Sequence, residues 1–121
     1  MLGKQTGSYG EELACKYLKK QGYKILQRNF RIRGGEIDIV AKDPAPDGVG
    51  QTVFVEVKTR SSHEYGDPAE AITPWKIRFL IRAAQFYLLK NKLTDKPYRI
   101  DAVTVDFTNG ERIEHFKNIT F

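Results

Sequence analysis

The segment Thr52–Lys58, which reads TVFVEVK, constrains the fold more than any other part of this sequence. Its β-branched and aromatic residues predict a buried strand. Because side chains alternate across a strand, its three valines share one face, whereas Phe54, Glu56 and Lys58 share the other. We therefore expect a strand that is anchored in a core on one side and presents a carboxylate and an ammonium on the other.

The other predicted elements surround this strand. Ser8 and Glu11 fit a capping box, which predicts a helix that begins at Ser8 and stops at Gly22. Thr73 and Pro74 are typical of an N-cap and a first helical position, and predict a second helix that ends at about residues 89–92. Further strands are predicted at residues 23–30, 36–41 and 98–107, with a possible return strand at 112–116 after a hairpin turn.

Residues 43–50 and 61–73 are rich in turn-forming residues and are expected to be loops. The resulting order is α-β-β-β-α-β-(β). It predicts a single α/β domain over residues 1–121, with a central mixed sheet flanked by helices.

Length and composition exclude several classes of protein. With 121 residues, 40% of them hydrophobic and 29% charged, the chain has the composition of a globular domain. No apolar run approaches the roughly 20 residues of a membrane helix, and the first residues lack the apolar region of a secretory signal. Cys15 has no partner for a disulfide, and His63 and His115 are isolated, which argues against a zinc site. We expect a cytoplasmic protein.

Basic residues are segregated along the chain. Lys and Arg exceed Asp and Glu by 20 to 15, for a net charge of +5. Residues 13–35 and 74–93 carry twelve of the basic residues and no acidic one. Such segregation suits a surface that binds a polyanion, although a solvated basic face is the simpler alternative.

A second charged residue, Asp38, interrupts the preceding predicted strand. Alternation places Ile37 and Ile39 on one face of that strand and Glu36, Asp38 and Val40 on the other. If this strand pairs with residues 52–58 as a hairpin, the Asp38 and Glu56 carboxylates can approach each other. The alternative is a surface strand with ordinary cross-strand charges, which is weakened because an unpaired carboxylate in a hydrophobic strand is costly.

Two carboxylates on adjacent strands, with a lysine beside them, suit the hydrolysis of a phosphodiester. Asp38 and Glu56 would hold Mg²⁺ or Mn²⁺ through oxygen, and the Val57 carbonyl between the catalytic side chains is an expected further ligand. Lys58 would orient or help to deprotonate the attacking water and would stabilise the transition state.

These residues also carry a resemblance to a known family. Asp38 followed by Glu56-Val57-Lys58 resembles the PD-(D/E)XK signature of nucleases with the restriction-endonuclease-like fold. Over nearly the whole chain, and most specifically in GEID at residues 35–38 and FVEVKTR at residues 54–60, the sequence looks like the YraN-like family of bacterial proteins. That family is similar to archaeal Holliday junction resolvases. Ile37 stands where the superfamily signature has proline, at a position that is not a metal ligand.

The resemblance implies further site residues. It implies an acidic residue from the first helix, and Glu11 occupies that position, with a capping role left open. It also implies a phosphate contact for Lys76, although Arg60, two residues beyond Lys58 on the same strand face, is the better phosphate candidate by geometry. The residues expected to contact nucleic acid are Arg31, Arg33, Arg60, Lys76, Arg78 and Arg82.

Four other residues carry weaker indications. Asp101 alternates with apolar residues and is expected to form a structural salt bridge, for instance with a basic residue of a helix. His63 lies in a predicted loop, where we expect exposure and keep a general-base role as the alternative. His115 and Cys15 have no chemical context in the sequence.

The second helix carries two apolar stripes. Ile77, Leu80, Ile81, Ala84 and Leu88 form the stripe of a core-facing helix. A second stripe, on nearly the opposite side, consists of Trp75, Phe79, Ala83 and Phe86. A contiguous exposed apolar patch usually marks an interface, so we expect a homodimer through this helix, with a grip on unpaired bases as the alternative.

Together these features predict an endonuclease that needs Mg²⁺ or Mn²⁺ and hydrolyses DNA, with branched or structured DNA implied by the family resemblance. Two alternatives stay open. One is a non-catalytic nucleic-acid-binding protein that retains the nuclease fold. The other is an assembly partner that acts through the Trp75/Phe79/Phe86 face.

Overall fold

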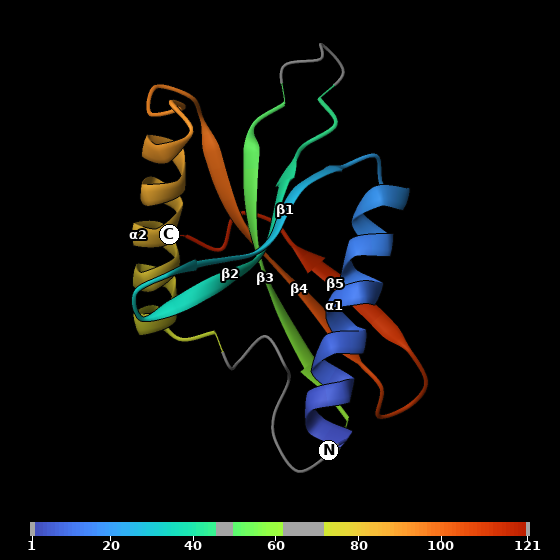
Figure 1. The fold of residues 1–121 in the computed structure, drawn as a ribbon. Helices are drawn as coiled ribbons and strands as arrows, with labels where there is room; N and C mark the ends of the chain where they lie inside the picture. The colour runs from blue at the N-terminus through green and yellow to red at the C-terminus, as the bar shows by residue number, and fades with distance from the viewer. Residues whose placement is uncertain (1, 46–49, 62–71, 121) are drawn as a thin grey trace.

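The computed structural model describes residues 2–45, 50–61 and 72–120, with side chains from residue 8 onward. In this part of the chain two helices flank one five-stranded sheet (Figure 1). The elements are α1 (Leu2–Lys20), β1 (Lys24–Ile32), β2 (Gly35–Lys42), β3 (Thr52–Arg60), α2 (Pro74–Lys90), β4 (Tyr98–Asp106) and β5 (Arg112–Phe116). The predicted α/β class and the order of elements are confirmed, including the possible last strand.

The strands follow one another across the sheet in the order β1-β2-β3-β4-β5. Neighbouring strands are antiparallel, except that β3 and β4 are parallel. A parallel pair needs a crossover connection, and here the connection contains α2. The sheet is therefore mixed, as predicted, and its central strand β3 has a partner on each side.

Each face of the sheet has its own apolar core. Toward α1, Val53 and Val55 of β3 pack with Ala14 and Leu18 of the helix. Toward α2, Phe54 packs with the second helix. Since both faces are covered, β3 is buried on both sides from Thr52 to Glu56, whereas the alternation of its residues predicted a core on the side of the valines. Neither helix of the described residues has the length and hydropathy needed to span a membrane.

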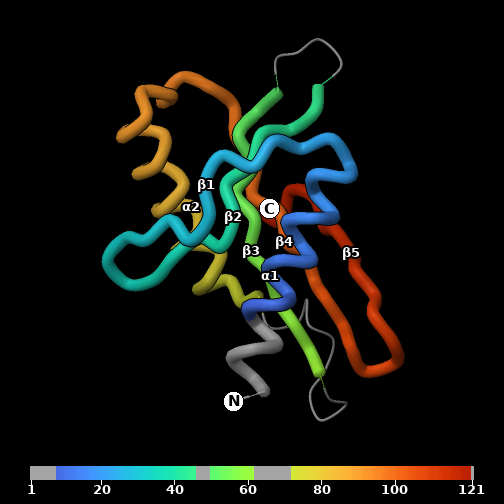
Figure 2. Tube along the Cα trace, turned by 45° about the vertical axis from the view of Figure 1, so that its right-hand side comes forward, coloured from blue at the N-terminus to red at the C-terminus, as the bar shows by residue number. Residues whose placement is uncertain are grey.

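Helix α2 begins as predicted. Thr73 is the N-cap, and its side chain accepts a hydrogen bond of 3.2 Å from the Lys76 N–H. The predicted second apolar stripe of this helix is exposed only at Trp75 and Phe86. The prediction is wrong for Phe79 and Ala83, which lie between them and are buried. The β1–β2 hairpin covers them: a Cβ added to Gly35 would lie only 2.9 Å from the Phe79 ring. Both views draw this hairpin beside α2 (Figures 1 and 2).

Helix α1 begins earlier than predicted. It starts at Leu2, so Ser8 lies inside the helix and is not its N-cap. The capping-box interpretation of Ser8 and Glu11 is therefore wrong. Directly after Ser8, tertiary contacts support the helix: the Tyr9 ring stacks on Phe107 at 5.8 Å between centroids, and Gly10 lies against Thr59 of β3. The end of the helix, before Gly22, agrees with the prediction.

Gly10 allows α1 to approach β3 closely, and this contact yields a prediction with a definite sign. A Cβ at residue 10 would lie 2.0 Å from Thr59 Cγ2. Gly10→Ala would ordinarily stabilise a helix by about 1 kcal/mol. We expect it instead to destabilise this protein by about 1–3 kcal/mol, because the helix must move away from the strand. Urea denaturation measures the change.

A second substitution isolates the contact. Thr59→Ser removes Cγ2, so the double variant Gly10→Ala/Thr59→Ser should recover much of the lost stability relative to Thr59→Ser alone. An increase in the free energy of unfolding for Gly10→Ala alone would show that α1 does not lie on β3 at this distance.

Candidate metal centre

The candidate site lies where the pairing between β2 and β3 ends. The two strands pair from Lys42 with Thr52 to Ile39 with Val55. Beyond that point the backbone N–H of Val57 donates a 2.8 Å hydrogen bond to Asp38 Oδ2. A side chain of β2 thus takes the donor that would otherwise seek a partner in the ladder.

This departure from regular pairing changes the direction of the side chains. Ile37 belongs to the core beside α2, whereas Ile39 belongs to the core beside α1. The prediction that the two isoleucines share a face is therefore wrong. On the neighbouring strand β1, Asn29 has a φ of 53°, which marks the same irregular part of the sheet. The irregularity lets Asp38 reach β3 from the edge of its own strand.

Three carboxylates from two elements, α1 and β2, gather at this point. One oxygen each from Glu11 of α1 and from Glu36 and Asp38 of β2 lie within 4.8 Å of one another. Asn29 Nδ2 donates to Glu11 Oε1 at 3.1 Å and to Glu36 Oε1 at 3.5 Å. We refer to Glu11, Glu36 and Asp38 as the acidic triad.

The acidic triad has fewer hydrogen-bond donors than its oxygens can accept. Glu36 Oε2 is buried and accepts no hydrogen bond from the described residues, and its ion-pair partner is Arg31, whose Nε lies 3.1 Å away on a largely exposed side chain. Buried carboxylate oxygens are stable only beside donors or positive charge, and this one has an ion pair without a hydrogen bond. Oxygen ligands from several carboxylates are those that Mg²⁺, Mn²⁺ and Ca²⁺ take. The residues present therefore fit a hard divalent cation.

Asp38 is the most perturbed member of the acidic triad. Burial, followed by the charge of Glu56, raises the pKa of its carboxyl from 3.8 to about 7, while the Val57 N–H opposes the rise. Glu11 and Glu36 add smaller effects in the same direction. Near neutral pH this carboxyl is therefore partly protonated in the metal-free protein, and a bound cation would displace the proton.

Glu56 lies next to the acidic triad but has partners of its own. It is 3% exposed, and its Oε2 lies 3.4 Å from Lys58 Nζ and 3.5 Å from Lys76 Nζ. The three predicted residues Asp38, Glu56 and Lys58 are thus brought to one end of β3. Lys76, predicted from the resemblance, joins them from the first turn of α2.

Glu36 is a member that the sequence interpretation did not select. Alternation along the strand placed it on the side of Asp38, so a signal was present in the GEID segment. The structure gathers Glu36, rather than Glu56, with Glu11 and Asp38 in the tightest carboxylate group. The role of the Val57 carbonyl stays a prediction, while the amide of the same residue positions Asp38.

The predicted nucleic-acid contacts occupy two other places. Arg31, Arg33 and Arg82 line a hollow between the β1–β2 turn and α2. Arg60 lines a different hollow, of about 240 Å³, together with Asp106 beside the β4–β5 turn. Arg78 is exposed on α2, and His63 lies outside the described residues.

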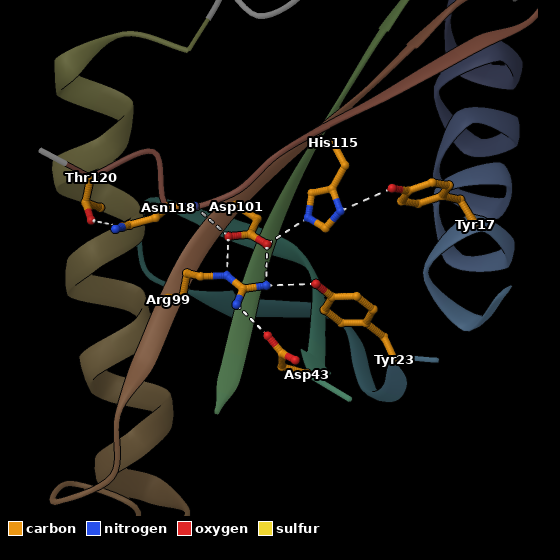
Figure 3. Close-up of polar contacts among 8 residues, drawn as sticks. All are labelled: Tyr17, Tyr23, Asp43, Arg99, Asp101, His115, Asn118 and Thr120. Atoms are coloured by element: carbon orange, nitrogen blue, oxygen red, sulfur yellow. Dashed lines mark hydrogen bonds and ion pairs between the residues drawn. The ribbon is translucent and has the colours of Figure 1, made fainter. Parts of the chain in front are cut away.

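A second polar cluster surrounds Asp101, which is fully buried (Figure 3). Its carboxylate accepts hydrogen bonds from Arg99 Nε at 2.8 Å, from the Asn118 N–H at 2.9 Å and from His115 Nε2 at 2.7 Å. The other ring nitrogen of His115 lies 3.4 Å from the Tyr17 hydroxyl of α1. Arg99 also donates to Asp43 and to the Tyr23 hydroxyl.

This cluster confirms a structural salt bridge for Asp101 but corrects its partner. The partner is Arg99 on the same strand, two residues away, rather than a residue of a helix. Burial raises the pKa of Asp101, but the hydrogen bonds from His115, Arg99 and the Asn118 amide outweigh it, and the net pKa is lowered. His115, which had no context in the sequence, acquires one because β4 and β5 pair.

Comparison with known proteins places the chain in a family. Residues 10–105 match the model of the uncharacterised protein family UPF0102. The chain belongs to this family. The match agrees with the resemblance to YraN-like proteins and contains Glu11, Glu36, Asp38, Glu56 and Lys58.

The relatives of this UPF0102 protein support the assignment over nearly its whole length. A UPF0102 protein of Pelobacter propionicus is 48% identical over 117 residues, which cover 95% of this chain and 81% of the relative. One from Geobacter metallireducens is 49% identical, with 95% and 91% covered. One from Thermotoga petrophila is 50% identical, with 90% and 91% covered.

Among solved structures, SfsA of Pyrococcus furiosus in complex with Ca²⁺ matches with a TM-score of 0.37 and 13% sequence identity. The match covers 95% of this chain but only 63%, less than two thirds, of the SfsA chain. At this level the likeness has no bearing on function.

The raised pKa of Asp38 predicts how stability depends on pH in the absence of metal. In the unfolded chain the carboxyl titrates near its ordinary value of about 3.9. The folded protein therefore holds the extra proton, and this contribution to stability is complete below about pH 4 and is lost as the pH rises through about 7.

Asp38→Asn keeps an acceptor for the Val57 N–H but cannot ionise. In EDTA at pH 8 we expect the unfolding temperature of the variant to be a few degrees higher than that of the wild type. We expect this gap between the two unfolding temperatures to shrink steadily toward pH 4.5. Thermal denaturation followed by circular dichroism measures both. A gap that does not change with pH would show that the Asp38 carboxyl titrates normally.

Proposed function

We propose that this protein is a metal-dependent endonuclease of the PD-(D/E)XK superfamily, which hydrolyses phosphodiester bonds of branched or structured DNA with Mg²⁺ or Mn²⁺. The observation that carries this proposal is the acidic triad at the end of β3, with Lys58 beside it. Glu11 lies on α1, and Glu36 and Asp38 lie on β2, with the whole of β1 between these elements in the sequence. One oxygen of each nevertheless lies within 4.8 Å of the others.

The chemistry of the site follows from its donors. Asp38, with oxygens of Glu11 and Glu36 close by, would hold the cation, and Glu56 and the Val57 carbonyl are the further candidates. A divalent cation at this position would neutralise phosphate charge and make a water a better nucleophile near neutral pH. The partly protonated Asp38 explains why the group tolerates its own negative charge until a cation arrives.

The protein's own cations then act on the substrate. The Lys58 ammonium is held 3.4 Å from Glu56 Oε2, which keeps it at the edge of the acidic residues. From there it can orient the attacking water and stabilise the charge that develops on the phosphate oxygens. Lys76 shares the same carboxylate oxygen at 3.5 Å and supplies a second positive charge from α2.

DNA is the proposed substrate because of the distribution of charge. The two acid-free segments, residues 13–35 and 74–93, contribute the arginines that line the hollow beside α2. Phosphate contacts of this kind give binding that weakens steeply as salt is added. The preference for branched or structured DNA rests on the family resemblance alone.

The proposal is tested by cleavage of four-way-junction, flap, single-stranded and linear DNA with Mg²⁺, Mn²⁺ or EDTA. The wild type should cut at least one structured substrate with metal and none with EDTA. Asp38→Asn and Lys58→Ala should each lower the rate by at least about 100-fold, since each removes a group that acts in the transition state. Both should bind DNA within a few fold of the wild type.

The outcomes separate the alternatives. Equal binding without cutting on every substrate would favour the non-catalytic nucleic-acid-binding protein. Cutting that survives Asp38→Asn would remove the acidic triad as the site of reaction.

The metal site itself is tested without turnover, by a matched pair of variants on α1. Glu11 belongs to the acidic triad, whereas the adjacent Glu12 pairs with Arg28 at 2.9 Å. Mn²⁺ should raise the unfolding temperature of the wild type and of Glu12→Gln, because a ligand that binds only the folded state stabilises it. Glu11→Gln and Glu36→Gln should lose most of this shift. An equal loss in Glu12→Gln would mean that the cation binds elsewhere.

A further inference from the structure

A hollow of about 570 Å³ lies between the β1–β2 turn and the second half of α2. Ile32, Phe86 and Leu89 are the apolar residues that line it, and Arg31, Arg33 and Arg82 are the charged ones. The volume falls in the range of roughly 300–1,000 Å³ that is usual for sites that bind small molecules or parts of larger ones. No acidic residue is among the described residues that line it.

Phe86 forms a supported platform in this hollow. The Phe30 ring lies behind it, at 6.4 Å between centroids, yet Phe86 is 53% exposed. Leu89, one turn further along α2, is 65% exposed. An aromatic ring that is fixed on one side and open on the other offers a stacking surface for a planar group.

Arg31 joins this hollow to the acidic triad. Its side chain lines the hollow, and its Nε lies 3.1 Å from Glu36 Oε2. A phosphate held by Arg31 would therefore lie next to the carboxylates proposed to hold the metal. Arg31 is therefore the residue that connects the aromatic platform with Glu36 of the acidic triad.

We propose that this hollow binds one unpaired nucleotide of the DNA, with the base stacked on Phe86 and its flanking phosphates held by Arg31, Arg33 and Arg82. Aromatic rings beside guanidinium groups are the usual means by which proteins hold unpaired bases without regard to sequence. The inference rests on the proposed nuclease function, and it names the feature of branched or structured DNA that the same site recognises. A strand with an unpaired base fills the hollow, whereas a continuous duplex keeps its bases stacked.

A second copy of the chain fits this hollow less well. A two-fold contact brings the same surface from both copies together, so three arginines would face three arginines. The burial of Phe79 and Ala83 also leaves little of the apolar stripe that a dimer would use. The charge of the hollow therefore favours a polyanion.

The test uses DNA that carries 2-aminopurine, a fluorescent base, either in an unpaired flap or inside a duplex of the same length. Binding is measured in EDTA by fluorescence anisotropy and by the 2-aminopurine signal, so that no cleavage takes place. The wild type should bind the flap more tightly than the duplex and should change the signal of the unpaired base.

Two matched pairs of variants locate the effect. Phe86→Ala should lower the affinity for the flap by roughly tenfold and abolish the signal change, as expected for loss of one stacked base. Trp75→Ala, on the same helix and 65% exposed but outside the hollow, should change neither. Arg33→Gln should weaken binding and reduce its dependence on salt, whereas Lys19→Gln on the other helix should have less effect.

The result that overturns the inference is flap binding by Phe86→Ala that equals the wild type, in affinity and in signal. A dimer in sedimentation velocity that Phe86→Ala converts to a monomer would also overturn it, because the occupant would then be a second copy. Cleavage is assayed separately with Mg²⁺. A wild type that cuts DNA but binds the flap and the duplex equally removes this inference alone, and a wild type that prefers the flap but does not cut removes the proposed function alone.

Discussion

The mutual repulsion of four carboxylates at the end of β3 is the constraint on which the rest of this structure depends. Glu11, Glu36 and Asp38 converge, and Glu56 lies beside them. Free in water such groups would separate, because each ionised neighbour raises the cost of ionising the next. The fold holds them together by attaching each one to an element that is anchored in a core, and it limits the cost by leaving Asp38 partly protonated.

Several contacts that look local serve this convergence. Gly10 lets α1 lie against β3, one residue before Glu11. The Val57 amide holds Asp38, and the two lysines beside Glu56 balance its charge. On the same side of the sheet as α1, the cluster around Asp101 connects the later part of this helix to β4 and β5 through His115. Contacts at Gly10 and at Tyr17 thus hold the helix that contributes Glu11.

The sequence predicted the parts of the fold and site that follow from local periodicity. Alternation in TVFVEVK and the Thr73-Pro74 cap located β3 and α2, and through them Glu56 and Lys58. The interpretation failed where distant segments meet. Regular alternation could not reveal that Asp38 accepts a hydrogen bond from the Val57 N–H, or that Ile37 and Ile39 pack in different cores. Nor could a helical wheel show that a hairpin covers Phe79, which removes the middle of the expected interface.

The proposed function requires a cation among these carboxylates, and its binding can be observed directly. Crystals of the protein grown with Mn²⁺ and measured at the manganese absorption edge give an anomalous difference map that locates the ion. We predict a peak in contact with an Asp38 oxygen and with at least one of Glu11 and Glu36, at about the 2.0–2.3 Å typical of such bonds. A map without a peak there at millimolar Mn²⁺, or with the ion elsewhere in the molecule, would contradict this prediction.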